Sequence, residues 1–252
     1  MSALSSGPDY SAYRAPLSEL YDLLYLGRGK DFASEAKVVA GLIRARRPDA
    51  VSLLDVGCGT GEHLVTWRTM FAQVEGVDIA PDMVAVARAK LPGVPIHCGD
   101  MRDFDLGRTV DGISTLFSTL GYLPSPAELD AGVANLTRHL PLGGVLVAEP
   151  WWFPERFLDG HIGHDVVRKD GTTVARVVRT TLVEGTSRLE AHYVVADRQG
   201  IRSFVHVQRF TLFGHADYRD AFLRAGCEVE YLPEPGARMT TGRGLFVGVR
   251  RR

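Results

Sequence analysis

The segment LLDVGCGTGEH, at positions 53–63, constrains the fold more than any other stretch of the chain. A short apolar run, typical of a buried strand, leads into three glycines, and a helical pattern follows with Leu64, Trp67 and Phe71 on one face. Glycines at such a turn allow a tight backbone bend and let a ligand approach the N-terminus of the helix. The segment therefore predicts a strand, a ligand-binding loop and a helix, in that order.

The spacing of Gly57, Gly59 and Gly61 excludes two common nucleotide-binding loops. A dinucleotide loop reads G-x-G-x-x-G, whereas this chain has Glu62 at the sixth position and reads G-x-G-x-G. A P-loop requires a Gly-Lys-Ser or Gly-Lys-Thr sequence, and none follows here. The loop therefore indicates a different ligand.

Strand and helix patterns alternate around this loop, from residue 51 to residue 150. The predicted strands include VEGVD, VPIHCGD, DGISTLF and GGVLVAEP. One of the helices between them starts after Ser125, which has the capping-box spacing to Glu128. Such alternation requires right-handed crossovers and a sheet covered by helices on both faces. We therefore predict an α/β fold with a doubly wound, mostly parallel sheet.

The alternation stops after Pro150. From about Val166 to Phe213, β-branched and aromatic runs are separated by Asp-Gly, Glu-Gly and Gln-Gly turn signals, which predicts a small antiparallel sheet. A last helix and two strands, CEVEYLP and GLFVGV, then return to the first sheet. We predict one α/β domain formed by residues 1–150 and 214–252, with residues 151–213 inserted as an antiparallel β region.

Composition narrows the range of partners. Lys and Arg number 29 against 30 Asp and Glu, for a net charge of −1, so we expect neither nucleic acid nor a membrane as partner. No segment resembles a signal peptide or a spanning helix, which favours a cytoplasmic protein. Cys58, Cys98 and Cys227 lack a metal-binding spacing, and His161 and His164, expected in an exposed loop, have no third ligand nearby. We expect no disulfide and no metal.

With Asp55 directly before the glycine loop, the segment resembles the first motif of the class I S-adenosylmethionine-dependent methyltransferases. The resemblance implies their Rossmann-like fold, with S-adenosyl-L-methionine as cofactor. It places Asp55 near the amino group of the cofactor. It also places the backbone at Gly57, Gly59 and Gly61 beside the carboxylate and the sulfonium.

Three further features follow in the order typical of that family. Asp78 ends the second strand, with Ile79 after it, and its carboxylate can accept hydrogen bonds from both ribose hydroxyls. Asp100 and Met101 resemble the adenine-contacting segment, and Phe117 follows the fourth strand. All of these residues lie at the carboxyl ends of successive strands, where open α/β sheets bind ligands. A helix cap is the structural alternative for an aspartate such as Asp78.

A closer resemblance covers nearly the whole chain. It rests on the segments ELYDLLYLGRGKDF, SLLDVGCGTG, GDMRDFDLG, EPWWFPERF and GRGLFVGV. Together they resemble the N,N-dimethyltransferases that act on dTDP-linked deoxyaminosugars of the desosamine and mycaminose type. The resemblance implies dimethylation of a sugar amine in macrolide-type antibiotic biosynthesis, by a homodimer. The chain departs from that pattern in reading VGCG for VACG and in having Asp78 for glutamate, and neither change removes a functional group.

Residue by residue, this resemblance assigns roles around the reacting amine. Tyr21 and either Lys30 or Arg28 are expected at the methionine end of the cofactor. Tyr13 and Tyr122 are expected to face the amine of the substrate. We predict that these two tyrosines form hydrogen bonds that aim the amine, with partly buried aromatic packing as the structural alternative.

The segment EPWWFPERF places two adjacent tryptophans between prolines, directly after the fifth strand. The prolines stiffen the chain where the antiparallel region begins. We expect Glu149 and Trp152 to wall the acceptor pocket, while packing of the insertion onto the core is the alternative for at least one tryptophan. Arg243 is expected to contact the nucleotide part of the substrate. The insertion is expected to shape this pocket and to provide a dimer contact.

The reaction so implied is an in-line displacement at the sulfonium methyl by a neutral amine, which requires alignment and no covalent enzyme intermediate. One alternative function is methyl transfer to another small-molecule amine or hydroxyl. Another is a non-catalytic protein that binds the cofactor. Arg168, Arg176 and Arg179 are predicted to lie on solvated strand faces, and a contact with the substrate diphosphate is their alternative role.

Overall fold

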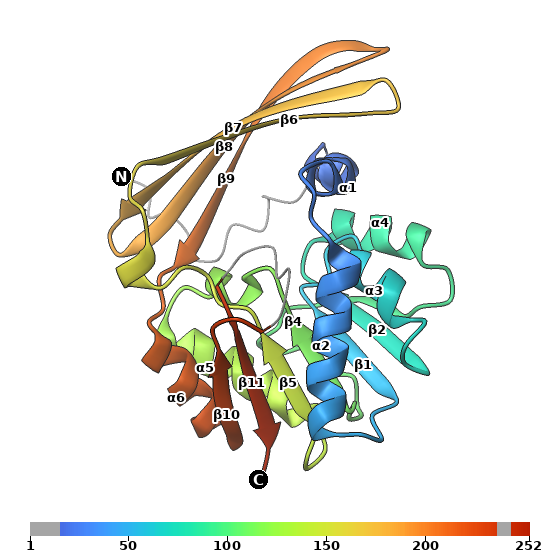
Figure 1. The fold of residues 1–252 in the computed structure, drawn as a ribbon, viewed down its shortest axis with the longest axis vertical. Coiled ribbons are helices and arrows are strands. Elements are labelled where there is room, and N and C mark those ends of the chain that lie inside the picture. The colour runs from blue at the N-terminus through green and yellow to red at the C-terminus, as the bar shows by residue number, and fades with distance from the viewer. Residues whose placement is uncertain (1–15, 236–242) are drawn as a thin grey trace.

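The computed structural model describes residues 16–235 and 243–252, whose strands form two separate sheets (Figure 1). The larger sheet has the strand order β10-β11-β5-β4-β1-β2-β3. Its strands are β1 (Ser52–Val56), β2 (Gln73–Asp78), β3 (Ile96–Cys98), β4 (Gly112–Thr115), β5 (Val145–Ala148), β10 (Cys227–Leu232) and β11 (Leu245–Arg250). β11 is antiparallel to both of its neighbours, and the remaining pairs are parallel. The predicted α/β fold with a mostly parallel sheet is confirmed.

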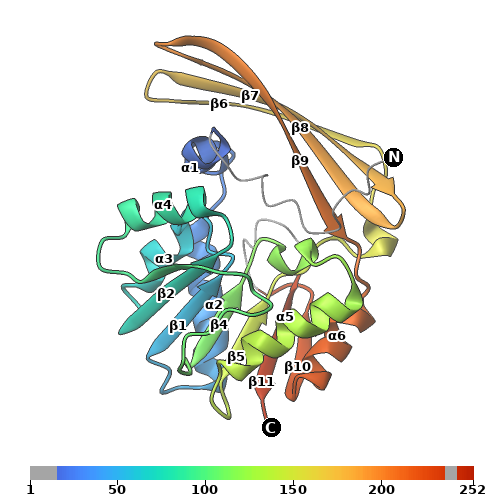
Figure 2. The same ribbon diagram turned by 180° about the vertical axis from the view of Figure 1, so that it is seen from behind.

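Helices cover both faces of this sheet, as Figures 1 and 2 show from opposite sides. One face carries α2 (Phe32–Arg46), α3 (Glu62–Trp67) and α4 (Pro81–Lys90), and the other carries α5 (Pro126–Arg138) and α6 (His215–Arg224). Successive strand residues alternate between them, so Leu53 packs with the first group and Leu54 with the second. None of the described helices has the length and hydropathy needed to cross a membrane.

The helices begin where the sequence predicts. The Oγ of Ser125 accepts a hydrogen bond from the backbone N–H of Glu128 at the start of α5 (3.3 Å). Asp31 caps α2 by accepting from the backbone N–H of Ser34 (2.9 Å). These caps satisfy backbone donors that the first turn of a helix leaves unpaired.

The second sheet is an antiparallel meander of long strands. Its strands are β6 (His161–Lys169), β7 (Thr172–Val183), β8 (Thr186–Asp197) and β9 (Gly200–Thr211). The Asp-Gly and Glu-Gly signals form two-residue turns, since Asp170, Gly171, Glu184 and Gly185 all have positive φ angles. The predicted antiparallel sheet is confirmed. It begins at His161, and His161 and His164 therefore lie on a strand and not in the expected loop.

The second sheet has an inner face that packs on α1 (Leu17–Gly27). The contact joins Leu17, Leu20 and Leu24 of the helix to apolar side chains of β6, β7 and β8. Arg176 also lies on this inner face and is only 6% exposed, and its guanidinium pairs there with Asp165 (3.1 Å). The prediction that Arg176 lies on a solvated face is therefore wrong.

The carboxyl ends of the parallel strands point toward the second sheet, and α1 lies between the two (Figures 1 and 2). Parallel strands end at one edge of a sheet, so the loops that follow β1, β2 and β4 gather there. A site at this edge therefore draws residues from both sheets.

Candidate active site

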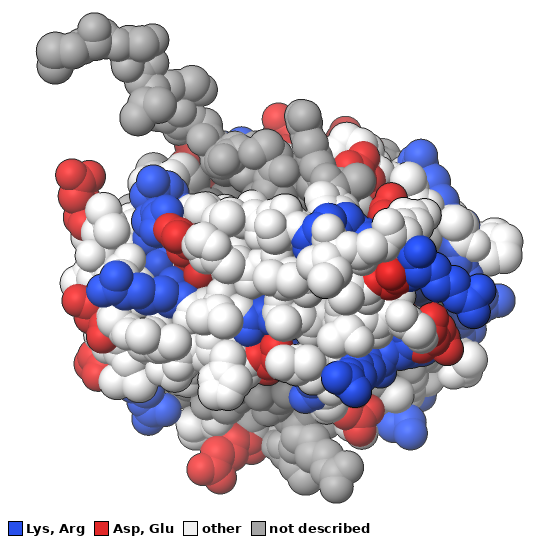
Figure 3. Space-filling model, turned by 90° about the horizontal axis from the view of Figure 1, so that it is seen from above, with Lys and Arg blue, Asp and Glu red and all other residues white. Residues whose placement is uncertain are grey.

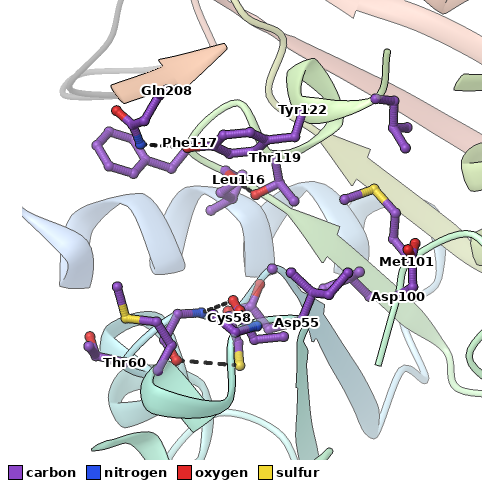
Figure 4. A pocket seen from close by; sticks show the side chains of 18 of the residues that line it. Asp55, Cys58, Thr60, Asp100, Met101, Leu116, Phe117, Thr119, Tyr122 and Gln208 are labelled. Atoms are coloured by element: carbon purple, nitrogen blue, oxygen red, sulfur yellow. Dashed lines mark hydrogen bonds between the residues drawn. The ribbon is translucent and has the colours of Figure 1, made fainter. Parts of the chain in front are cut away.

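A cavity of about 890 Å³ opens at this edge. Most of the predicted site residues line it, namely Tyr21, Asp55, Gly57, Gly59, Asp78, Ile79, Asp100, Met101, Phe117 and Tyr122. Figure 4 shows two groups of side chains: Asp55, Cys58 and Thr60 on one side, and Thr119, Tyr122 and Gln208 on the opposite side. We call the part lined by residues 55–60 and Asp78 the glycine-loop half. The part lined by Thr119, Tyr122 and Gln208 is the second-sheet half.

The glycine loop has a backbone that only glycine adopts without strain. Gly57, Gly59 and Gly61 have φ angles of 74°, 54° and 80°. A Cβ on Gly57 would lie 2.4 Å from Cγ2 of Thr119, so no side chain fits between the loop and the segment after β4. Gly61 is the N-cap of α3 and lies against Leu91, outside the residues that line the cavity.

Asp78 connects the loop to the end of β2. Its Oδ2 accepts a hydrogen bond from the backbone N–H of Gly59 (2.7 Å). Its Oδ1 accepts one from the backbone N–H of Ala80 (2.9 Å), and Ala80 is the N-cap residue of α4. Burial raises the pKa of Asp78, and these backbone hydrogen bonds oppose the rise. Asp78 is not a helix cap, because the N-cap of α4 is Ala80 and no side chain caps that helix. Its carboxylate instead braces the backbone of the loop and also lines the cavity.

Asp55 is 2% exposed, at the carboxyl end of β1. Burial raises its pKa to about 6, although the nearby His63 opposes the shift. Asp100 is oriented by Arg102, whose backbone N–H and side chain both donate to it (2.9 Å each). The same guanidinium reaches Glu128 on α5 (2.7 Å), so the loop after β3 is tied to a helix.

A buried charged cluster beside the loop was not predicted. Glu35, which is fully buried, accepts from the Lys30 ammonium (2.7 and 2.8 Å) and pairs with His63 Nε2 (2.9 Å). Burial alone would raise the pKa of Glu35, but the His63 hydrogen bond and the Lys30 charge lower it to about 2. His63 and Phe32 line the cavity. A sequence signal did exist for His63, a polar residue on the apolar helix face shared by Leu64 and Trp67.

Neither of the two basic candidates for the methionine end lines the cavity. The ammonium of Lys30 lies 4.2 Å from the ring centroid of Phe117, which does line it. Arg28 pairs with Asp165 on β6 (3.0 Å) and so joins α1 to the second sheet. Lys30 is thus the nearer of the two to the cavity wall.

The second-sheet half begins with a strained turn after β4. Phe117 and Ser118 have φ angles of 55° and 66°, values that non-glycine residues rarely adopt. The turn leads into the 3₁₀ helix η2 (Thr119–Tyr122), which carries Tyr122 to the cavity. Gln208 Nε2 on β9 donates to Tyr122 Oη (2.7 Å). Thr119 and Gln208 were not predicted, because no local pattern marks them.

Glu149, Trp152 and Arg243 form a cluster behind Phe117, outside the residues that line the cavity. Fully buried Glu149 accepts from the backbone N–H of Phe117 (2.6 Å) and lies 3.5 Å from Nη2 of Arg243. The guanidinium carbon of Arg243 lies 4.8 Å from the ring of Trp151 and 5.3 Å from that of Trp152. Tyr13 lies outside the described residues.

Comparison with known proteins identifies the family. A family model described as a methyltransferase domain matches residues 53–144. A dTDP-3-amino-3,4,6-trideoxy-alpha-D-glucopyranose N,N-dimethyltransferase of Streptomyces venezuelae is 50% identical over 238 residues, which cover 94% of this chain and 99% of that enzyme. The chain belongs to the class I S-adenosylmethionine-dependent methyltransferases and is closely related to the dTDP-aminosugar N,N-dimethyltransferases.

Two further relatives of this methyltransferase support the same placement. A dTDP-4-amino-2,3,4,6-tetradeoxy-D-glucose N,N-dimethyltransferase of Saccharopolyspora spinosa is 42% identical and covers 95% of each chain. One solved structure shows an S-adenosylmethionine-bound amino pentose methyltransferase of Micromonospora echinaspora that is involved in calicheamicin biosynthesis. Its sequence is 52% identical to this chain. It has a TM-score of 0.84 and covers 92% of this chain and 96% of its own. The predicted relationship to the aminosugar N,N-dimethyltransferases is confirmed.

Proposed function

We propose that this methyltransferase transfers methyl groups from S-adenosylmethionine to the amino group of a dTDP-linked deoxyaminosugar and dimethylates it, in the biosynthesis of an antibiotic sugar. The observation that carries the proposal is the 50% identity, over almost the full length of both chains, to an enzyme named for that reaction. The two related dimethyltransferases are named for a 3-amino and a 4-amino sugar.

The glycine-loop half suits S-adenosylmethionine. The backbone at Gly57 and Gly59 lines the cavity, and Asp78 lines it with acceptor oxygens suited to ribose hydroxyls. We assign Asp55 to the amino group and the segment at Asp100 and Met101 to the adenine. When bound, the cofactor supplies an electrophilic methyl group on its sulfonium. The role of the protein is then to orient the amine and to keep water out.

The second-sheet half suits the acceptor. Tyr122 places a phenol oxygen in the cavity, where it can accept an N–H from the amine and leave the nitrogen lone pair directed at the cofactor. We assign Tyr13 to the same amine and Tyr21 to the methionine end of the cofactor. Phe32 and Phe117 line the space beside the reaction and reduce its access to water. Glu149 and Trp152 are assigned to the wall of the acceptor pocket, and Arg243 is assigned to the nucleotide part.

A substrate panel tests this function. Purified protein is incubated with S-adenosylmethionine and with dTDP-linked 3-amino sugars, 4-amino sugars or simple amines, and the products are identified by mass spectrometry. We expect one class of nucleotide sugar to gain two methyl groups. If only simple amines or hydroxyl compounds were methylated, the alternative of a different small-molecule acceptor would replace it. If the cofactor bound in calorimetry and no acceptor reacted, a non-catalytic role would be favoured.

We also propose that the enzyme is a cytoplasmic homodimer in which the inserted region, residues 151–213, provides the contact. The support is the outer face of the second sheet, which we define by Ile162, Val166, Val177, Val194, Ile201 and Val205, each between 46% and 79% exposed. These residues lie on adjacent strands and form a broad uncharged area in Figure 3. Apolar patches of this kind mark protein interfaces, and a second copy of the same face is the complementary partner.

A further inference from the structure

Strand β9 of the second sheet contacts the tyrosine that we assign to the amine. Gln208, which lies opposite Leu189 of β8, donates its Nε2–H to Oη of Tyr122 (2.7 Å). Both side chains line the cavity, and Figure 4 shows the hydrogen bond between β9 and the segment that carries Tyr122. One sheet thus provides the glycine loop, and the other reaches the phenol.

The ring of Tyr122 is held by the same strand. Phe210 lies two residues beyond Gln208, hence on the same face of β9, and its ring centroid is 4.5 Å from that of Tyr122. Trp151 also stacks on Phe210, with ring centroids 4.2 Å apart. A Cβ on Gly121 would lie 3.1 Å from the Cβ of Trp151 and 3.3 Å from Cδ1 of Phe210, so the backbone beside Tyr122 is also closely packed. Packing therefore fixes the ring, and Gln208 fixes the position of its oxygen.

We infer that Gln208 is a positioning residue for methyl transfer, acting through the phenol oxygen of Tyr122; this inference rests on the proposed function. The amide N–H donates to that oxygen and holds it in the cavity, at the position where we expect it to meet the substrate amine. The direction of the nitrogen lone pair follows from that contact. The second sheet thereby sets the aim of the acceptor, while the larger sheet sets the position of the cofactor.

A double-mutant cycle tests this assignment. Gln208→Met retains the length of the side chain and removes the hydrogen bond. In the otherwise unchanged enzyme it is expected to lower kcat for the aminosugar by about tenfold, the effect of one ordinary hydrogen bond, with KM within about twofold. In a Tyr122→Phe background the same change is expected to lower kcat less than about twofold, because the oxygen through which Gln208 acts is already absent.

Two controls separate positioning from damage to the fold. Gln199→Met changes a glutamine in the exposed turn between β8 and β9 and is expected to leave kcat unchanged. Calorimetry with S-adenosylmethionine checks each variant, because the glycine-loop half does not include Gln208. An unaltered kcat in Gln208→Met, or an equal loss in both backgrounds, would overturn the inference. Failure of the proposed function gives a different result, since the unmodified protein would then methylate no nucleotide sugar.

Discussion

At the scale of single residues, Asp55 has the property that is easiest to test. Burial raises its pKa to about 6 from an ordinary 3.8. When folding raises the pKa of a carboxyl, its contribution to stability is fully present at pH values below the pKa of the unfolded chain. This contribution is lost as the pH rises through the pKa of the folded protein. Asp55→Asn is neutral at every pH. Its free energy of unfolding is therefore expected to be about 3 kcal/mol higher than that of the parent at pH 8. At pH 5 the increase is expected to be about half as large.

Urea unfolding of the cofactor-free protein at the two pH values measures this difference. Asp49→Asn is the matched control, because the side chain of Asp49 is 81% exposed. It should show no comparable dependence on pH. A gain in Asp55→Asn that is the same at pH 5 and pH 8 would contradict a buried, ionisable Asp55.

The candidate site also shows which residues a sequence can indicate. Asp55, Asp78 and the glycines follow strands in a fixed order, so their shared edge could be predicted from the alternation alone. Glu35 and His63 are 28 positions apart and meet only because α2 packs against α3. Gln208 meets Tyr122 across 86 positions and two sheets. No local pattern contains such contacts.

At the scale of elements, α1 forms part of the cavity wall through Tyr21. The next residue, Asp22, accepts from Thr60 of the glycine loop (2.5 Å) and from Lys90 at the end of α4 (2.5 Å). Asp22→Asn is expected to weaken this attachment and to raise the Kd for S-adenosylmethionine by about tenfold in calorimetry. Glu19→Gln, on the exposed face of the same helix, is the control and should bind normally. An unchanged Kd in Asp22→Asn would show that cofactor binding does not depend on the hydrogen bonds that attach α1 to the glycine loop and α4.

The two tryptophans after β5 share a contact with Arg243 but differ in their other contacts. Trp151 also stacks on Phe210 and so joins the second sheet to the core, whereas Trp152 packs against the Arg243 guanidinium. Trp151→Ala is expected to lower the free energy of unfolding by about 2 kcal/mol or more. Trp152→Ala is expected to raise KM for the sugar nucleotide with a smaller effect on stability. Thermal unfolding and steady-state kinetics of both variants test these expectations. If Trp152→Ala lowered stability more and Trp151→Ala raised KM more, the two roles would be reversed.

Turns and helix starts could be predicted from the sequence where they depend on neighbouring residues. The Asp-Gly and Glu-Gly pairs form the turns of the second sheet, and Ser125 caps α5, because each of these features depends on a few neighbouring residues. The reversed direction of β11 was not predicted, since it depends on how the chain returns to the sheet. The burial of Arg176 was not predicted either, since it depends on which face of β7 packs on α1.

At the scale of the whole molecule, the outer face of the second sheet predicts the oligomeric state. Val194→Lys places a charge in the middle of this face, and we expect it to convert a dimer into a monomer in light scattering after size-exclusion chromatography. Leu142→Lys is the control, because Leu142 is 65% exposed and precedes β5 of the other sheet. A Val194→Lys protein that stays dimeric would place the interface elsewhere.

We propose that the cofactor and the aminosugar meet between the two sheets, with the amine aimed from the second sheet. A crystal structure with S-adenosylhomocysteine and a dTDP-linked aminosugar tests it most directly. We predict that the cofactor product lies on the glycine loop with its ribose at Asp78, and that the sugar nitrogen is within hydrogen-bond distance of Tyr122 and points at the sulfur. A sugar nitrogen directed away from Tyr122, or a nucleotide sugar bound outside the cavity, would contradict the claim.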